Sequence, residues 1–105
     1  MQIQINTDSN IEGTDQLTQQ VEAVVRDALV RFSDKITRME VHLSDENSDK
    51  KFGTEDHRCL LEARLAGLQP ISVSHQAATL ERAVAGAVDK LKRSLDSTLG
   101  RLGRR

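Results

Sequence analysis

The sequence predicts an α+β protein of two layers, in which a four-stranded mixed sheet carries both helices on one face. Two observations support this fold class. Apolar and polar residues alternate in four short segments, which is typical of strands with one buried face. In two longer segments the apolar residues recur at spacings of three and four, which is typical of amphipathic helices. The resulting order over 105 residues is β-α-β-β-β-α, and one-sided elements pack most simply as two layers.

The N-terminal part of the chain predicts one strand and one helix. Residues 1–7 (MQIQINT) place isoleucine on one face and polar side chains on the other, so we expect a half-buried strand. A helix is expected over residues 15–33, with Thr14 or Asp15 as its N-cap. The apolar stripe of this helix consists of Leu17, Val21, Val24, Val25, Ala28, Leu29 and Phe32.

Three further strands are expected over residues 37–44, 58–67 and 71–75. Residues 45–56 are charged and rich in turn formers, so we expect an exposed, mobile hairpin loop. The first connection predicts a right-handed crossover with a parallel strand pair, and the later ones predict antiparallel pairs. The helix-facing side is expected to hold Thr37, Met39, Val41, Leu43, Cys59, Leu61, Ala63, Leu65, Ile71 and Val73. The solvated side is expected to hold Arg38, Glu40, His42, Glu62 and Arg64.

A second helix is expected to begin at about Ala77. Gly100 and Gly103 weaken its last turns, so residues 100–105 are expected to form a frayed tail. Its apolar stripe consists of Leu80, Val84, Ala87, Val88, Leu91, Leu95, Leu99 and Leu102.

Composition restricts the class of protein. A chain of 105 residues suits one domain, residues 1–105, and its core must be aliphatic because two Phe are its only aromatic residues. No apolar run is long enough to span a membrane, so no membrane partner is expected. The start of the chain lacks the features of a signal peptide. The single Cys forms no internal disulfide, which fits a cytoplasmic location.

Positive charge is concentrated at the C-terminal end of a chain whose net charge is −1. Residues 1–57 carry six Lys or Arg against twelve Asp or Glu, whereas residues 89–105 carry six against two. On a helical wheel, one arc of the second helix presents a basic row about 28 Å long. Its members are Arg82, Lys90, Arg93 and Arg101. Such a row suits a phosphate backbone, although cations near a helix C-terminus are also common on ordinary solvated faces.

No catalytic or cofactor-binding pattern is present in the sequence. It contains no nucleophile motif and no glycine-rich phosphate loop, and we expect no enzyme activity, no cofactor and no small-molecule substrate, although the residues alone leave a Ser–His or Cys–His nucleophile pair open. The possible metal ligands are His42, His57, His75 and Cys59. His57 and Cys59 share a strand face, but no second ligand pair has a known spacing, so no metal site is expected.

Three stretches of the chain and the order of its elements carry a family resemblance. The stretches are NIEGT (10–14), RFSDKITRMEVHL (31–43) and LERAVAGAVDKLKRSL (80–95). Together they resemble the ribosome hibernation factors, the family of the hibernation-promoting factor and ribosome-associated inhibitor A, in its short form. The resemblance covers roughly residues 1–99. Its most specific part is the motif made by Asp89, Lys90, Leu91, Arg93 and Leu95.

The resemblance implies a cytoplasmic translation inhibitor of stationary phase or stress, without catalytic residues. Members of this family bind small-subunit ribosomal RNA in the channel for messenger and transfer RNA and block that channel sterically. Lys90 and Arg93 match the family motif, and Arg82 and Arg101 extend their row. Basic residues on and just after the first helix would add RNA contacts. These are Arg26, Arg31, Lys35 and Arg38.

A second class of function stays open. The open sheet face and the acidic loop at 45–56 could form a protein-interaction module that binds no RNA. Salt separates the two hypotheses, because binding to phosphates weakens steeply as the salt concentration rises.

Overall fold

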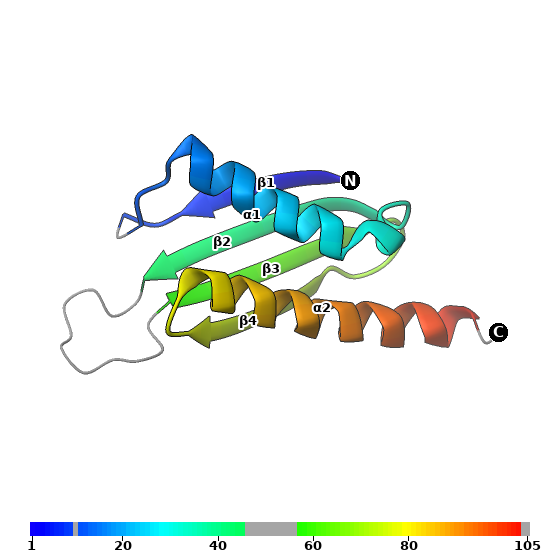
Figure 1. Cartoon of the computed structure of the whole chain (residues 1–105). Helices are drawn as coiled ribbons and strands as arrows, with labels where there is room; N and C mark the ends of the chain where they lie inside the picture. The colour runs from blue at the N-terminus through cyan, green and yellow to red at the C-terminus, as the bar shows by residue number, and fades with distance from the viewer. Residues whose placement is uncertain (10, 46–56, 104–105) are drawn as a thin grey trace.

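Four strands form one sheet in the order β1-β2-β3-β4, and both helices lie on one of its faces (Figure 1). β1 (Gln2–Thr7) pairs in parallel with β2 (Ile36–Asp45). β3 (His57–Leu65) pairs antiparallel with β2 on one side and with β4 (Ile71–Ala77) on the other. The predicted α+β class, element order and mixed sheet are confirmed.

The computed structural model describes residues 1–9, 11–45 and 57–103. Apart from its first residue, the hairpin loop expected over 45–56 therefore lies outside the described residues, as do the last two residues of the chain.

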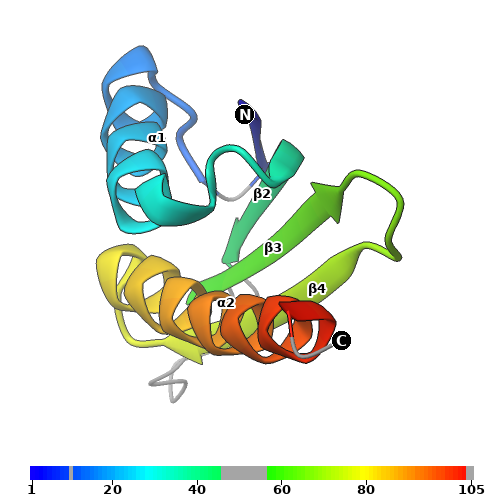
Figure 2. The ribbon, with the colours of Figure 1, turned by 90° about the vertical axis from the view of Figure 1, so that its right-hand side faces the viewer.

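Two helices cover the sheet on one side. α1 (Asp15–Ala28) contacts β1, and α2 (Leu80–Gly103) lies along β3 and β4 (Figure 2). The N-cap of α1 is Thr14, whose Oγ1 accepts a hydrogen bond from the backbone N–H of Leu17 at 3.1 Å. This bond satisfies one of the free N–H groups of the first turn, which explains why the helix begins here.

α1 ends earlier than the helix predicted over residues 15–33. It stops at Ala28, and a single 3-10 turn, η1 (Val30–Phe32), follows. Leu29 lies between the two with φ −106° and ψ 15°, outside the helical range. The apolar spacing hides this break because Leu29 and Phe32 are three residues apart, a separation that keeps both side chains buried in either kind of helix.

The core lies between the sheet and the helices and is almost wholly aliphatic. Phe32 is its one aromatic member, and no polar or charged residue among those described is buried. Burying each large aliphatic side chain contributes about 1.5–3 kcal/mol, so this layer dominates the stability of the fold. The largest fully buried side chains are Leu29, Met39, Leu43, Leu61, Leu91, Leu95, Val25, Val41 and Cys59.

One member of the predicted helix-facing set was wrong. Thr37 is exposed, and Ile36 is buried instead. The pairing of β2 with β3 shifts between Ile36 and Arg38, which leaves one extra residue on β2 and forms a β-bulge. The Thr37 hydroxyl donates to the backbone oxygen of Arg64 at 3.0 Å. A bulge shifts by one residue the alternation of buried and exposed side chains along the strand. A prediction that assumes strict alternation therefore places Thr37 on the wrong face.

α2 begins later than the helix predicted from about Ala77. Ala77 is instead the last residue of β4, buried and paired with His57. The helix starts at Leu80. The residue before it, Thr79, accepts a hydrogen bond on its Oγ1 from the backbone N–H of Arg82 at 3.2 Å. A side-chain cap of this kind fixes a helix start more firmly than the apolar period does.

α2 also continues further than predicted. A frayed tail was expected over residues 100–105, but residues 100–103 are helical and α2 ends at Gly103. Leu99 packs against the core, and Arg101 donates to the Ser97 hydroxyl at 2.8 Å one turn below. These contacts hold the last turns in spite of their glycines.

Gly86 of α2 packs closely against the sheet. A methyl group at this position would overlap the imidazole ring of His75 on β4. We expect Gly86→Ala to lower the free energy of unfolding by about 1 kcal/mol, because overpacking at about 1–3 kcal/mol exceeds the gain in helix propensity. Chemical denaturation measures the difference. Adding His75→Ala should restore stability, and a Gly86→Ala protein more stable than the parent would show that the ring yields freely.

Candidate nucleic-acid interface

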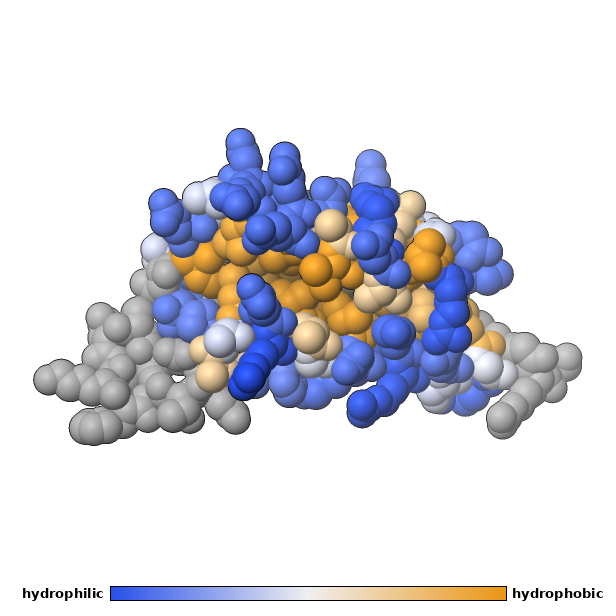
Figure 3. Space-filling view, viewed as in Figure 1, coloured by the Kyte–Doolittle hydropathy of each residue, from blue (hydrophilic) through white to orange (hydrophobic). Residues whose placement is uncertain are grey.

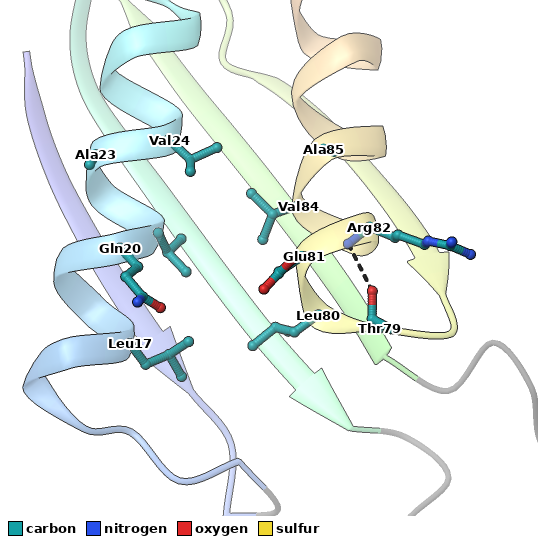
Figure 4. A pocket seen from close by; sticks show the side chains of 11 residues that line it. Leu17, Gln20, Ala23, Val24, Thr79, Leu80, Glu81, Arg82, Val84 and Ala85 are labelled. Carbon is teal, nitrogen blue, oxygen red and sulfur yellow. Dashed lines mark hydrogen bonds between the residues drawn. The ribbon is translucent and has the colours of Figure 1, made fainter.

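Four basic side chains line the outer flank of α2, along the edge strand β4. They are Arg82, Lys90, Arg93 and Arg101, and all four residues are exposed. Lys90 Nζ donates to the backbone oxygen of Ser74 on β4 at 2.8 Å, which fixes the side of the helix on which the row lies. At the start of the row, Arg82 points away from α1 (Figure 4). Helix geometry places the other two within the same arc.

The charges of this basic row are not neutralised. Within the described part of the chain, none of its four members forms an ion pair with a carboxylate. Lys90 bonds a neutral carbonyl, and Arg101 bonds the neutral Ser97 hydroxyl. The outer flank of α2 therefore presents four uncompensated positive charges in a line, an arrangement that can follow a phosphate backbone.

The predicted residues on α1 and η1 lie elsewhere and are ion-paired. Arg26 pairs with Glu22 at 3.1 Å, one turn away on α1. Arg31 pairs with Asp96 of α2 at 2.9 Å and stacks over the ring of Phe32, 4.5 Å from its centroid. Their charges are partly cancelled, which weakens them as independent phosphate ligands.

The last two predicted residues are also separate from the row. Lys35 is exposed in the turn before β2. Arg38 lies on the opposite face of the sheet, where Glu40 is close to Arg38 at 3.6 Å, Arg64 at 3.9 Å and His42 at 3.5 Å. This face was predicted to be solvated, and its exposed pairs contribute little to stability. The structure therefore brings four of the eight predicted residues together and disperses the other four.

A groove between α1 and α2 was missed by the sequence reasoning. It has a volume of about 1000 Å³, and mainly apolar side chains of the two helices line it (Figures 3 and 4). Val24, assigned to the buried stripe of α1, is 50% exposed at this groove. The sequence feature that could have indicated the groove is the width of the apolar stripe of the first helix, since Val24 belongs to that stripe but is not covered by the sheet. The lining residues are Leu17, Gln20, Val21, Ala23, Val24, Thr79, Leu80, Glu81, Arg82, Val84 and Ala85.

The residues considered as metal ligands have different surroundings. Cys59 is fully buried in the core, His42 is exposed on the open sheet face, and His75, the cross-strand partner of Cys59, packs against Gly86. No group of three potential ligands is close enough to hold a metal ion in the ranges that the structure describes. In those ranges, neither helix is apolar over a length that would cross a membrane.

Burial raises the pKa of the Cys59 thiol from 9.0 to about 12. The folded state thus favours the neutral form of the Cys59 thiol. This preference stabilises the fold fully below pH 9, and the stabilisation is lost as the pH rises toward 12. The loss is at most about 1.4 kcal/mol per pH unit. Urea unfolding at pH 8 and pH 10.5 measures it, and Cys59→Ala should lose less stability over this interval than the parent. Equal losses in the two proteins would show that thiol ionisation is not responsible.

Comparisons with known proteins give a family and a fold. A family model described as Sigma 54 modulation protein / S30EA ribosomal protein matches residues 3–102. The Thermus thermophilus Protein Y N-terminal domain is similar with a TM-score of 0.71 and 26% identity, over 93% of this chain and 99% of that chain. A ribosomal subunit interface protein from Coxiella burnetii shares the fold, with a TM-score of 0.72 and 16% identity. The match covers 95% of this chain and 99% of that chain. The search of curated proteins found no match.

Proposed function

This chain belongs to the family of the sigma 54 modulation protein and S30EA ribosomal protein, and from that premise we propose that it is a ribosome-associated translation inhibitor. It binds ribosomal RNA of the small subunit in the channel for messenger and transfer RNA. It acts in the cytoplasm, under stress or in stationary phase, as a hibernation factor. The match over residues 3–102 bears out the family resemblance seen in the sequence.

The single observation that supports RNA binding most directly is the basic row on α2. Its four charges are free of carboxylate partners among the described residues, and they follow one helix flank. Each such side chain that meets a phosphate releases a condensed counterion, which supplies affinity without any contact to a base. RNA helices are recognised mainly through their shape and backbone, so a rigid basic flank suits this target.

Inhibition in this proposal follows from occupancy. A folded domain bound in the channel excludes messenger and transfer RNA sterically, so neither a catalytic residue nor a cofactor takes part. The rigid α2, anchored along β3 and β4, holds the basic row in a fixed line while the rest of the domain fills space.

Salt dependence tests the proposed function. The purified protein should sediment with small ribosomal subunits at about 50 mM monovalent salt and dissociate by about 300 mM, because most contacts are to phosphate. Sedimentation with large subunits alone serves as the control for specificity. Absence of binding at every salt concentration would overturn the proposal. Binding that is insensitive to salt would favour the protein-interaction module on the open sheet face.

A further inference from the structure

The groove between α1 and α2 is an unfilled apolar surface. Val24 of α1 and Val84 and Leu80 of α2 face one another across it (Figure 4). Figure 3 shows apolar atoms gathered in this hollow and hydrophilic side chains around its rim. A hollow of about 1000 Å³ with apolar walls is large enough for several side chains of a partner.

An ion pair outside the groove also joins the two helical segments. Arg31 of η1 and Asp96 of α2 meet at 2.9 Å, and neither residue lines the groove. The N-termini of α1 and α2 stand apart, and Leu17 and Thr79 line the opening (Figures 1 and 4). A segment of another chain can therefore enter from the N-terminal end and lie between the helices.

The polar side chains that point into the groove carry negative charge or none. The Glu81 carboxylate points into the space between the helices, with the Gln20 amide on the facing helix (Figure 4). Glu81 forms no ion pair with any residue that the structure describes. Arg82, the next residue and the first member of the basic row, also lines the groove, but its side chain points away from α1. The groove thus combines apolar walls with an available carboxylate.

We propose that this groove binds a basic amphipathic segment of another protein. Apolar side chains of the segment insert beside Val24 and Val84, and a Lys or Arg of the segment pairs with Glu81. This is the helix-in-groove mode of recognition, in which apolar anchors provide affinity and a charged rim selects the partner.

Charge and shape favour this occupant over two others. RNA is disfavoured because Glu81 repels phosphates and most of the groove wall is apolar. A second copy of the chain is disfavoured because Val24 and Val30 are the only large apolar side chains exposed on its described surface, too few to fill the groove.

Binding in the groove goes beyond the proposed function and does not depend on it. The basic row and the groove share Arg82, but its side chain points away from α1, whereas the neighbouring Glu81 points into the groove. One helix can therefore bind RNA on its outer flank and a protein segment on its inner flank.

A designed peptide tests the groove. The probe is a fluorescent helical peptide of about 14 residues, made of Leu and Lys with Leu at helical spacing, and fluorescence anisotropy measures its binding to the full chain. We expect saturable binding of one peptide per protein. Glu81→Lys and Val24→Gln should each weaken binding at least about fivefold. Glu12→Lys, which changes the net charge equally at an exposed position outside the groove, should leave it unchanged.

The controls decide between the possible occupants. A peptide of the same composition in scrambled order should bind at least about tenfold more weakly, since it has no apolar face. Equal binding of the scrambled peptide, or an unchanged affinity of Glu81→Lys and Glu81→Gln, would overturn the proposal. So would dimerisation that Val24→Gln abolishes in sedimentation equilibrium, because a second copy would then occupy the groove. Thermal unfolding of each variant confirms that the fold is retained.

Discussion

Replacing Lys90 and Arg93 with glutamate is expected to lower the affinity for small ribosomal subunits by at least about 100-fold at low salt. The two substitutions remove two positive charges that meet phosphates and place two negative charges in the middle of the basic row. The dependence of log affinity on log salt should also become shallower, by about one for each phosphate that is no longer neutralised. Co-sedimentation over a salt series measures both quantities.

Lys92 provides a matched control for this prediction. It is next to Arg93 on α2, but it lies outside the basic row, about 100° away around the helix. Arg93→Glu should reduce binding strongly, whereas Lys92→Glu, with the same change in charge, should reduce it only slightly. An equal reduction in the two variants would mean that overall charge, and not the outer flank of α2, determines binding.

Leu91→Ala is expected to lower the free energy of unfolding by about 3 kcal/mol. Leu91 is fully buried where α2 packs on the sheet, so the substitution removes apolar packing and leaves a cavity. Domains of this size are commonly stable by only about 5–15 kcal/mol, so the loss should be plain in urea unfolding.

Leu99, about two helical turns further along α2, serves for comparison with Leu91. It is only partly buried against the core, and Leu99→Ala should cost less than half as much. A loss below about 1 kcal/mol for Leu91→Ala would show that α2 shifts to fill the space.

The order and the facing of the elements were predictable because each depends on a local period. Alternation placed Met39, Val41 and Leu61 in the core, where the structure has them. The predicted boundaries of strands and helices were wrong where a single residue interrupts the apolar period. The bulge at Thr37 depends on pairing with β3, and the start of α2 depends on the hydroxyl of Thr79, so neither follows from spacing alone.

The candidate site was predictable in part for a similar reason. The basic row follows one helix flank, which a wheel describes without knowledge of the fold. Whether a charge is neutralised depends on partners distant in sequence, as with Arg31 and Asp96, which are 65 positions apart. The groove depends on the separation between two helices, a distance that neither helix sequence specifies. Val24 illustrates this, because it belongs to an apolar stripe and still remains half-exposed.

The parallel pairing of β1 has a consequence for the way the chain folds. β2, β3 and β4 are consecutive in sequence, so each finds its neighbour across a short connection. β1 must instead pair with residues 36 positions away, from Gln2 with Arg38 onward, across the segment that contains α1. Closing that longer loop costs more entropy. During synthesis β1 leaves the ribosome before β2 and is therefore expected to remain unpaired until β2 has emerged, so this edge of the sheet is completed late.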